Sequence, residues 1–110
     1  MSMDELLKKL KQEYLEQIPE KIKEIQHLFD NNKITELRNS FHKLKGSGKT
    51  YGVAPISIIS ERMEKICSES PDKVNQEIID LYKAILEDIK DQIITSEEET
   101  FKDPRFRALQ

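Results

Sequence analysis

Apolar residues recur at intervals of three and four along most of the chain, which is the period of an α-helix with one buried face. Turn-forming residues interrupt this pattern at Pro19, at residues 30–32, at residues 52–55 and at residues 70–72. The chain therefore divides into five helical segments. We predict helices near residues 3–17, 19–31, 33–51, 55–69 and 72–95.

The breaks between these segments are short, and their chemistry fits helix ends. Proline is tolerated in the first turn of a helix, so Pro19 and Pro55 begin helices, and Gly52 ends the helix before it. Short connections join antiparallel neighbours. The expected fold class is therefore all-α, an up-and-down antiparallel four-helix bundle with an additional N-terminal helix.

Apolar stripes mark the side of each helix that should face the core. The third and fifth segments carry the longest stripes, and we expect their members to point inward. Those of the third are Ile34, Leu37, Phe41, Leu44, Gly48 and Tyr51, and those of the fifth are Val74, Ile78, Leu81, Tyr82, Ile85, Ile89 and Ile93. In the first segment Leu6, Leu7, Leu10, Tyr14 and Leu15 also recur at helical spacing.

The bundle is expected to occupy residues 1–95, and residues 96–110 form a C-terminal tail. Ser96 and Glu99 have the spacing of a capping box for one more short helix, which Pro104 would interrupt. Phe106 and Leu109 either dock on the bundle or stay loose. The sequence leaves both possibilities open.

Composition narrows the class of protein further. A chain of 110 residues with 35% charged and 36% hydrophobic residues suits one helical domain. The net charge of −3 gives no general attraction to nucleic acid. The single cysteine, Cys67, excludes an intrachain disulfide, and no apolar run approaches a membrane span. We expect a cytoplasmic protein.

The unusual stretch lies on the third helix around His42. On a helical wheel His42 lies roughly 130° from the centre of the apolar stripe, so its side chain should point to water. Arg38, Lys45, Gly46 and Lys49 fall within roughly 60° of His42 on the same wheel. An exposed imidazole is largely neutral near pH 7 and is then a good nucleophile.

The basic side chains of this stretch would stabilise an arriving phosphoryl group. Glycine inside a helix costs about 1 kcal/mol relative to alanine, so Gly46 and Gly48 need a compensating role. We interpret Gly46 as leaving room for a partner's active site above His42. Gly48 faces inward, and we interpret it as allowing close helix packing.

Two other interpretations of the stretch remain open on residue pattern alone. A surface histidine among lysines is most often a solvated helix face. Residues 46–50 also resemble the end of a phosphate-binding loop, but the motif needs glycine where Lys43 stands and a preceding β-strand. Nucleotide binding is therefore disfavoured.

Residues 41–64 resemble the signature of histidine-containing phosphotransfer (HPt) domains. That family has a histidine, an aliphatic residue two positions later, then Lys-Gly-Ser, and a glycine at the end of the helix. In this chain the histidine is His42 and the aliphatic residue is Leu44. Residues 45–47 are Lys-Gly-Ser, and Gly52 lies at the end of the helix. Residues 14–20 and the pair Met63-Glu64 are similar to the family's neighbouring helices. The resemblance extends over most of residues 4–93.

The resemblance implies a carrier rather than an enzyme. His42 would accept a phosphoryl group from a receiver-domain aspartate or a kinase and pass it to a response regulator, with Lys45 and Gly46 assisting at the site. It implies response-regulator receiver domains and a histidine or hybrid kinase as partners, no nucleic acid or membrane, and a monomer. No cofactor is expected on this chain, since the receiver would hold the Mg²⁺. The alternatives are a non-catalytic scaffold with a degenerate HPt fold, or the phosphotransfer domain of a chemotaxis-type kinase.

Overall fold

The computed structural model describes all 110 residues, and every regular element in it is helical. Four long helices form the bundle, and a further long helix precedes them. The elements are α1 (Met3–Glu16), α2 (Ile18–Asp30), α3 (Ile34–Thr50), α4 (Ala54–Glu69), the 3₁₀ turn η1 (Pro71–Lys73), α5 (Gln76–Lys90), α6 (Glu97–Lys102) and α7 (Pro104–Ala108). The predicted all-α bundle with an additional N-terminal helix is confirmed.

The helix ends follow local chemistry. The Ser2 hydroxyl accepts a hydrogen bond from the Glu5 amide and caps α1. Pro19 lies in the first turn of α2, and Gly52 adopts a left-handed φ of 72° just after α3. Glycine takes that conformation without steric cost, so the chain can reverse there. These breaks lie where the sequence pattern predicted them.

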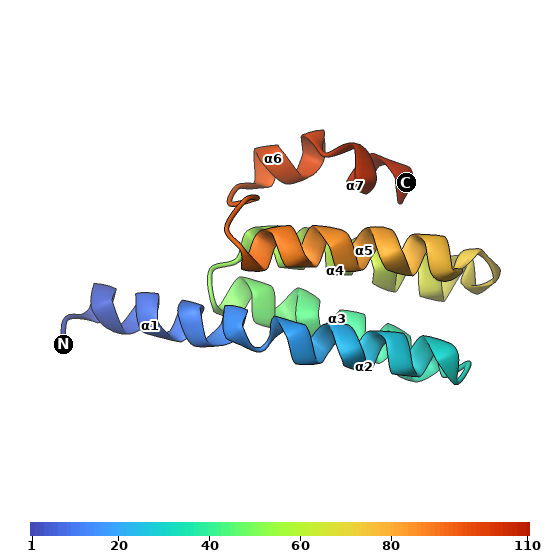
Figure 1. The fold of residues 1–110 in the computed structure, drawn as a ribbon, viewed down its shortest axis with the longest axis horizontal. Helices are drawn as coiled ribbons and strands as arrows, with labels where there is room; N and C mark the ends of the chain where they lie inside the picture. Colours follow the sequence, from blue (N-terminus) through green and yellow to red (C-terminus); the bar gives the residue numbers. More distant parts are fainter.

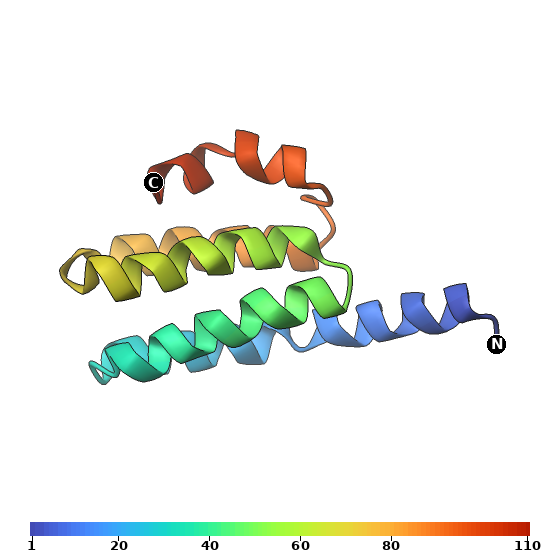
Figure 2. The ribbon, with the colours of Figure 1, turned by 180° about the vertical axis from the view of Figure 1, so that it is seen from behind.

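The four bundle helices close a ring of neighbours. Helix α3 packs on α2 and α4, and α5 packs on the same two helices from the other side. Figures 1 and 2 show the resulting two layers, with α2 and α3 in one and α4 and α5 in the other. At the centre Phe41 and Tyr82 meet edge to face, with ring centroids 4.9 Å apart. The Tyr82 hydroxyl is satisfied by Ser60 Oγ at 2.7 Å.

The fifth helix is shorter than predicted. It begins at Gln76 because the Asn75 side chain accepts a hydrogen bond from the Ile78 amide and caps the helix there. Residues 71–73 form the separate 3₁₀ turn. At the other end the helix stops at Lys90, and Gln92 has a left-handed φ of 59°.

Several side chains predicted to face inward do not. Tyr51 is 39% exposed and stacks on Tyr14, with ring centroids 4.8 Å apart, because α3 ends there at the edge of the bundle. Ile93 follows α5 and is exposed, since the chain has already left the helix. Ile34, Val74, Ile78 and Leu81 are only partly buried. The buried residues of α5 are Ile79, Tyr82, Ile85, Leu86 and Ile89.

The first helix extends beyond the bundle. Only Tyr14 and Leu15, near its end, are buried. Helix α1 runs in nearly the same direction as α2, which follows it, and its N-terminal part projects past the end of the other helices (Figure 1). The Tyr14 hydroxyl and Ser47 Oγ, 2.7 Å apart, join α1 to α3.

The C-terminal tail is docked. Ser96 Oγ accepts a hydrogen bond from the Glu99 amide, as predicted for a cap, and α6 follows. Phe106 and Leu109 are almost fully buried. Helix α6 contacts α4 and α7 contacts α5, so the tail covers the outer side of that layer (Figure 1). No helix of the chain is long and apolar enough to cross a lipid bilayer.

Candidate functional site

The site centres on His42, near the middle of α3, where it faces α4. Its neighbour Phe41 is fully buried and fixes the rotation of α3. The His42 side chain is 72% exposed. The predicted solvent-facing position of His42 is therefore what the structure shows.

One ring nitrogen of His42 is held by a carboxylate from the next helix. His42 Nδ1 lies 2.6 Å from Glu64 Oε2, and the Glu64 side chain is 22% exposed. An ionised carboxylate only accepts hydrogen bonds, so Nδ1 carries the proton and donates it. In the neutral ring this leaves the Nε2 lone pair free.

This pairing gives the ring a defined chemistry. Glu64 fixes both the tautomer and the orientation of the imidazole, and its negative charge stabilises positive charge that develops on the ring when Nε2 forms a bond. Sequence reasoning noted Glu64 only as part of the resemblance and assigned it no role. The sequence feature that could have indicated a role for Glu64 is its position at the edge of the apolar face of the fourth helix, next to Met63.

The two helix-interior glycines meet opposite surroundings. A Cβ added at Gly46 would have no neighbouring atom within 4 Å, so the surface beside His42 is open. A Cβ added at Gly48 would lie 2.8 Å from the Ser57 amide nitrogen and 3.1 Å from the Val53 carbonyl oxygen. Gly48 therefore allows close contact between α3 and α4, as predicted.

The basic residues predicted around His42 lie on the same face of α3, but each of them makes different contacts. Arg38 lines an open hollow of about 270 Å³ together with His42 and Glu64. Lys45 forms an ion pair with Glu61 on α4, with Nζ and Oε1 3.6 Å apart. Lys49 is exposed near the end of α3 and forms no ion pair within the chain.

The hollow beside His42 is entirely polar. Its other two lining residues are Asn39 on α3 and Ser68 on α4. Arg38 is the one cation in this lining and Glu64 the one carboxylate. A negatively charged group arriving at Nε2 would therefore find the Arg38 guanidinium and two neutral polar side chains close by.

Residues 46–50 do not form a phosphate-binding loop. They are the last turns of α3, and the Thr50 hydroxyl donates a hydrogen bond to the Gly46 carbonyl oxygen. A nucleotide-binding loop needs free backbone amides after a β-strand. The helix supplies neither feature.

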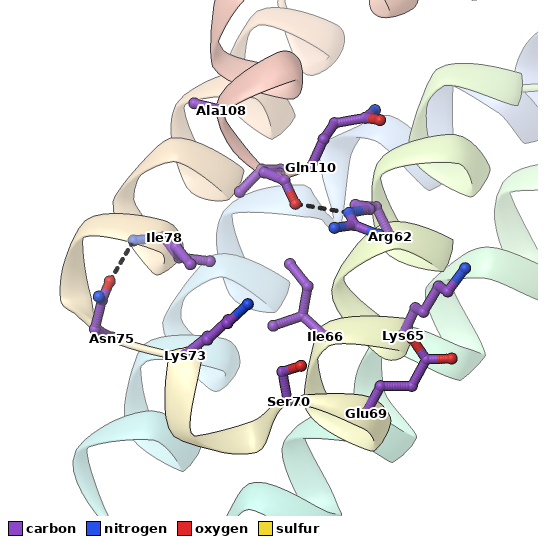
Figure 3. Close-up of a pocket in the computed structure, with 11 residues that line it drawn as sticks. Arg62, Lys65, Ile66, Glu69, Ser70, Lys73, Asn75, Ile78, Ala108 and Gln110 are labelled. Carbon is purple, nitrogen blue, oxygen red and sulfur yellow. Dashed lines mark hydrogen bonds between the residues drawn. The ribbon is translucent and has the colours of Figure 1, made fainter.

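A second hollow lies on the opposite side of α4, between α4, η1, α5 and the tail (Figure 3). Arg62 crosses it, and its Nε donates a hydrogen bond to the Leu109 carbonyl oxygen at 2.6 Å. Lys65 and Lys73 also line it. It shares no residue with the hollow beside His42, and the Arg62 contact ties the tail to α4.

Comparison with known families identifies the class of protein that this bundle and its exposed histidine define. The family model of the Hpt domain matches residues 9–92. The chain therefore belongs to the Hpt domain family. Domains of this family are phosphocarriers in two-component signalling rather than catalysts, and that is the class of function to which the chain belongs. Comparisons with curated proteins and with solved structures gave no significant match.

Proposed function

We propose that His42 is the phosphoryl carrier of this chain. The observation that supports it is the pairing of His42 Nδ1 with Glu64, which in the neutral ring leaves the Nε2 lone pair free on an exposed side chain. The other histidine, His27, lies on α2, and its Nδ1 is 3.4 Å from the Asn31 side-chain nitrogen, with no carboxylate holding it. Only His42 combines exposure with a charged orienting group.

In the proposed transfer a receiver domain carrying an aspartyl phosphate docks over His42. Nε2 attacks the phosphorus in line, the N–P bond forms, and the P–O bond to the receiver aspartate breaks and releases a carboxylate. The Nδ1 proton stays in the hydrogen bond to Glu64 throughout. Mg²⁺ held by the receiver supplies charge neutralisation at the phosphoryl oxygens.

The surrounding residues would act on the phosphoryl group and on docking. Arg38 lies in the same hollow as His42 and would approach the phosphoryl oxygens. Lys45 would exchange its exposed partner Glu61 for the phosphoryl group, a small loss because surface ion pairs contribute little. Gly46 would leave room for the receiver. Lys49, one further turn along, would meet the receiver surface.

The reverse reaction would pass the group from Nε2 to a second receiver's aspartate. We propose a response regulator as acceptor and a histidine or hybrid kinase as the source, through its receiver or directly. We propose that the chain holds no cofactor of its own for either step, because Nε2 is the nucleophile and the receiver would hold the Mg²⁺.

The test is phosphorylation of the purified protein by phosphorylated receiver domains in Mg²⁺. We expect an acid-labile, base-stable phosphoryl group on the wild type and on His27→Gln, and none on His42→Gln. Equal labelling of His42→Gln would contradict the assignment of the site. Absence of label on folded wild-type protein with several receivers would contradict the carrier function.

The role of Glu64 can be tested separately. In Glu64→Gln the ring loses the carboxylate that holds the Nδ1 proton, so we expect the rate of transfer to fall by about tenfold or more. Glu61→Gln is the matched control, because it removes a carboxylate one turn away that pairs with Lys45 instead. Equal rates in Glu64→Gln and wild type would show that this carboxylate does not assist the transfer.

A further inference from the structure

Helix α1 presents an apolar stripe that nothing in the chain covers. Met3, Leu6, Leu7 and Leu10 are between 37% and 69% exposed, and the stripe continues to Tyr51 at the end of α3. The N-terminal part of α1 projects beyond the bundle (Figure 1). A contiguous apolar patch on a protein surface marks an interaction site.

The stripe forms the floor of a groove between α1 and the end of α3. We call this hollow of about 460 Å³ the α1 groove. Leu7, Leu10 and Tyr51 are its apolar members. Its charged members are Lys8, Lys11 and Lys49, and no carboxylate lines it. The occupant that fits is an apolar segment that carries negative charge.

The charges of α1 itself match this requirement. On a helical wheel Asp4 and Lys11 lie side by side along one edge of the stripe. Residues 4–11 form no ion pair within the chain. The acidic residues are in the first turn and the lysines one to two turns later, so the helix is complementary to a reversed copy of itself.

A lipid surface fits this helix less well. Interfacial helices are rich in lysine and arginine on their polar face and are attracted to anionic lipids. Helix α1 carries four carboxylates against three lysines, at positions 4, 5, 13 and 16 and at positions 8, 9 and 11, a net charge of −1. Within residues 3–11 Asp4 and Glu5 accompany the three lysines, so the polar face is of mixed charge, whereas an interfacial helix has a basic one.

We propose that the occupant of the α1 groove is helix α1 of a second copy of this chain, packed antiparallel about a two-fold axis near Leu7. In this register Asp4 of each copy faces Lys11 of the other. The interface is isologous, so this pairing occurs twice. The first turn of each helix enters the groove of its partner.

The antiparallel direction follows from the shape of the molecule. Tyr14 and Leu15 are covered by the bundle, so a second helix can pack only on the earlier, exposed part of α1, residues 3–11. Parallel pairing would bring two bundles to the same end of the helix pair, whereas antiparallel pairing places them at opposite ends. The contact surface is short, which puts the dimer in the weak, transient class.

The first experiment is sedimentation of the full chain from about 10 µM to about 1 mM, the range for weak association. We expect monomer at the low end and dimer at the high end. Leu7→Glu should abolish the dimer. Ile93→Glu, which changes an exposed apolar side chain outside α1 and outside the α1 groove, should leave it unchanged. A monomer at every concentration would overturn the proposal.

The register is tested by charge reversal. Asp4→Lys and Lys11→Asp each place two like-charged pairs across the interface, and each should weaken self-association by about tenfold. An equimolar mixture of the two variants should restore association, because the heterodimer has opposite charges at both pairings. Weak association of the mixture would exclude this antiparallel register.

The dimer proposal does not rest on the phosphoryl-carrier proposal, although Lys49 belongs both to the α1 groove and to the proposed receiver surface. His42 lies on the face of α3 beside α4, and no residue of the α1 groove lines its hollow. Sedimentation requires no phosphoryl donor. Failure to dimerise is therefore detected by sedimentation, and failure to accept a phosphoryl group is detected by the phosphorylation assay. The expectation of a monomer from the sequence would then hold only at low concentration.

Discussion

Gly46 and Gly48 lie two residues apart on α3, and the difference between them comes entirely from what α4 places opposite. Gly46 faces open space beside His42. Gly48 is buried against the backbone of residues 53–57, which cannot move as a flexible side chain would. The same residue type therefore meets two opposite surroundings within one helical turn.

This contrast predicts opposite effects on stability. Gly48→Ala should lower the free energy of unfolding by about 1–3 kcal/mol, because its Cβ would overlap backbone atoms. Gly46→Ala should raise the free energy of unfolding by about 0.5–1 kcal/mol, because alanine loses less backbone entropy in a helix. Urea unfolding of both variants measures the difference. Equal destabilisation by the two would contradict the packing described for α3 and α4.

Cys67 is the other residue whose chemistry depends on its surroundings. It is 5% exposed near the end of α4. Burial raises the pKa of the Cys67 thiol to about 11, the Arg38 guanidinium opposes this shift, and the Glu64 carboxylate adds to it. The thiolate, which is the reactive form, is therefore scarce in the folded protein.

We expect Cys67 to react with a disulfide reagent at about pH 8 only as fast as the protein opens. Urea should accelerate the reaction in parallel with unfolding. The control is the double variant Cys67→Ser/Ser68→Cys, which moves the thiol to the neighbouring exposed position and should react rapidly in the native state. Fast reaction of native wild-type protein would contradict the burial of Cys67.

At the scale of elements, the docked tail depends on a small charged cluster. Arg105 donates hydrogen bonds to Asp103 and forms an ion pair with Asp88 on α5, with Nη2 2.8 Å from an oxygen of each. The Asp103 carboxylate also caps α7 by accepting from the Arg105 amide. The pKa of Asp103 lies below its ordinary value of 3.8, and the main cause is the hydrogen bond that the Arg105 side chain donates to it.

The lowered pKa of Asp103 determines how its contribution to stability depends on pH. Asp103 is more acidic in the folded than in the unfolded chain, so its contribution to stability is present above about pH 4 and is lost as the pH falls through the folded pKa. Asp103→Asn keeps the helix cap but removes the charge, and it should lower the free energy of unfolding at pH 7 by about 1 kcal/mol. The difference between variant and wild type should shrink towards about pH 2–3. A difference that does not change with pH would show that the charge contributes nothing.

At the scale of the whole molecule, the family match ends at residue 92, whereas the packed structure continues to the tail. Phe106 and Leu109 are buried, and Arg62 on α4 binds the Leu109 carbonyl oxygen. The tail therefore adds a layer to the bundle, and Phe106 and Leu109 join a core that α2 to α5 mainly supply. The core aromatic pair Phe41 and Tyr82 lies within the family region.

Removal of residues 96–110 should accordingly weaken the fold without abolishing it. We expect residues 1–95 to remain a helical bundle that accepts a phosphoryl group, with a free energy of unfolding lower by about 2–4 kcal/mol, because lost apolar burial outweighs the regained chain entropy. Circular dichroism during thermal unfolding measures this. An unfolded truncated chain would show that the tail is part of the folding unit.

Much of this molecule could be predicted from local pattern. The 3.6-residue period identified the helices, proline and glycine marked their ends, and the wheel placed His42 outside the core and Gly48 inside it. These features depend on residues within a few turns of one another, so the sequence contains them directly. The predictions for Tyr51 and Ile93 were wrong because periodicity does not say where a helix stops facing its neighbours.

The sequence alone determined that this chain is an all-α bundle with an exposed histidine beside basic residues and glycines. Only the tertiary structure decided that Glu64, twenty-two positions from His42 in the chain, holds its Nδ1, that the tail docks, and that α1 projects with its apolar stripe uncovered. The physical reason is that helix formation is governed by neighbouring residues, whereas contacts between helices depend on how the packed faces bring distant residues together.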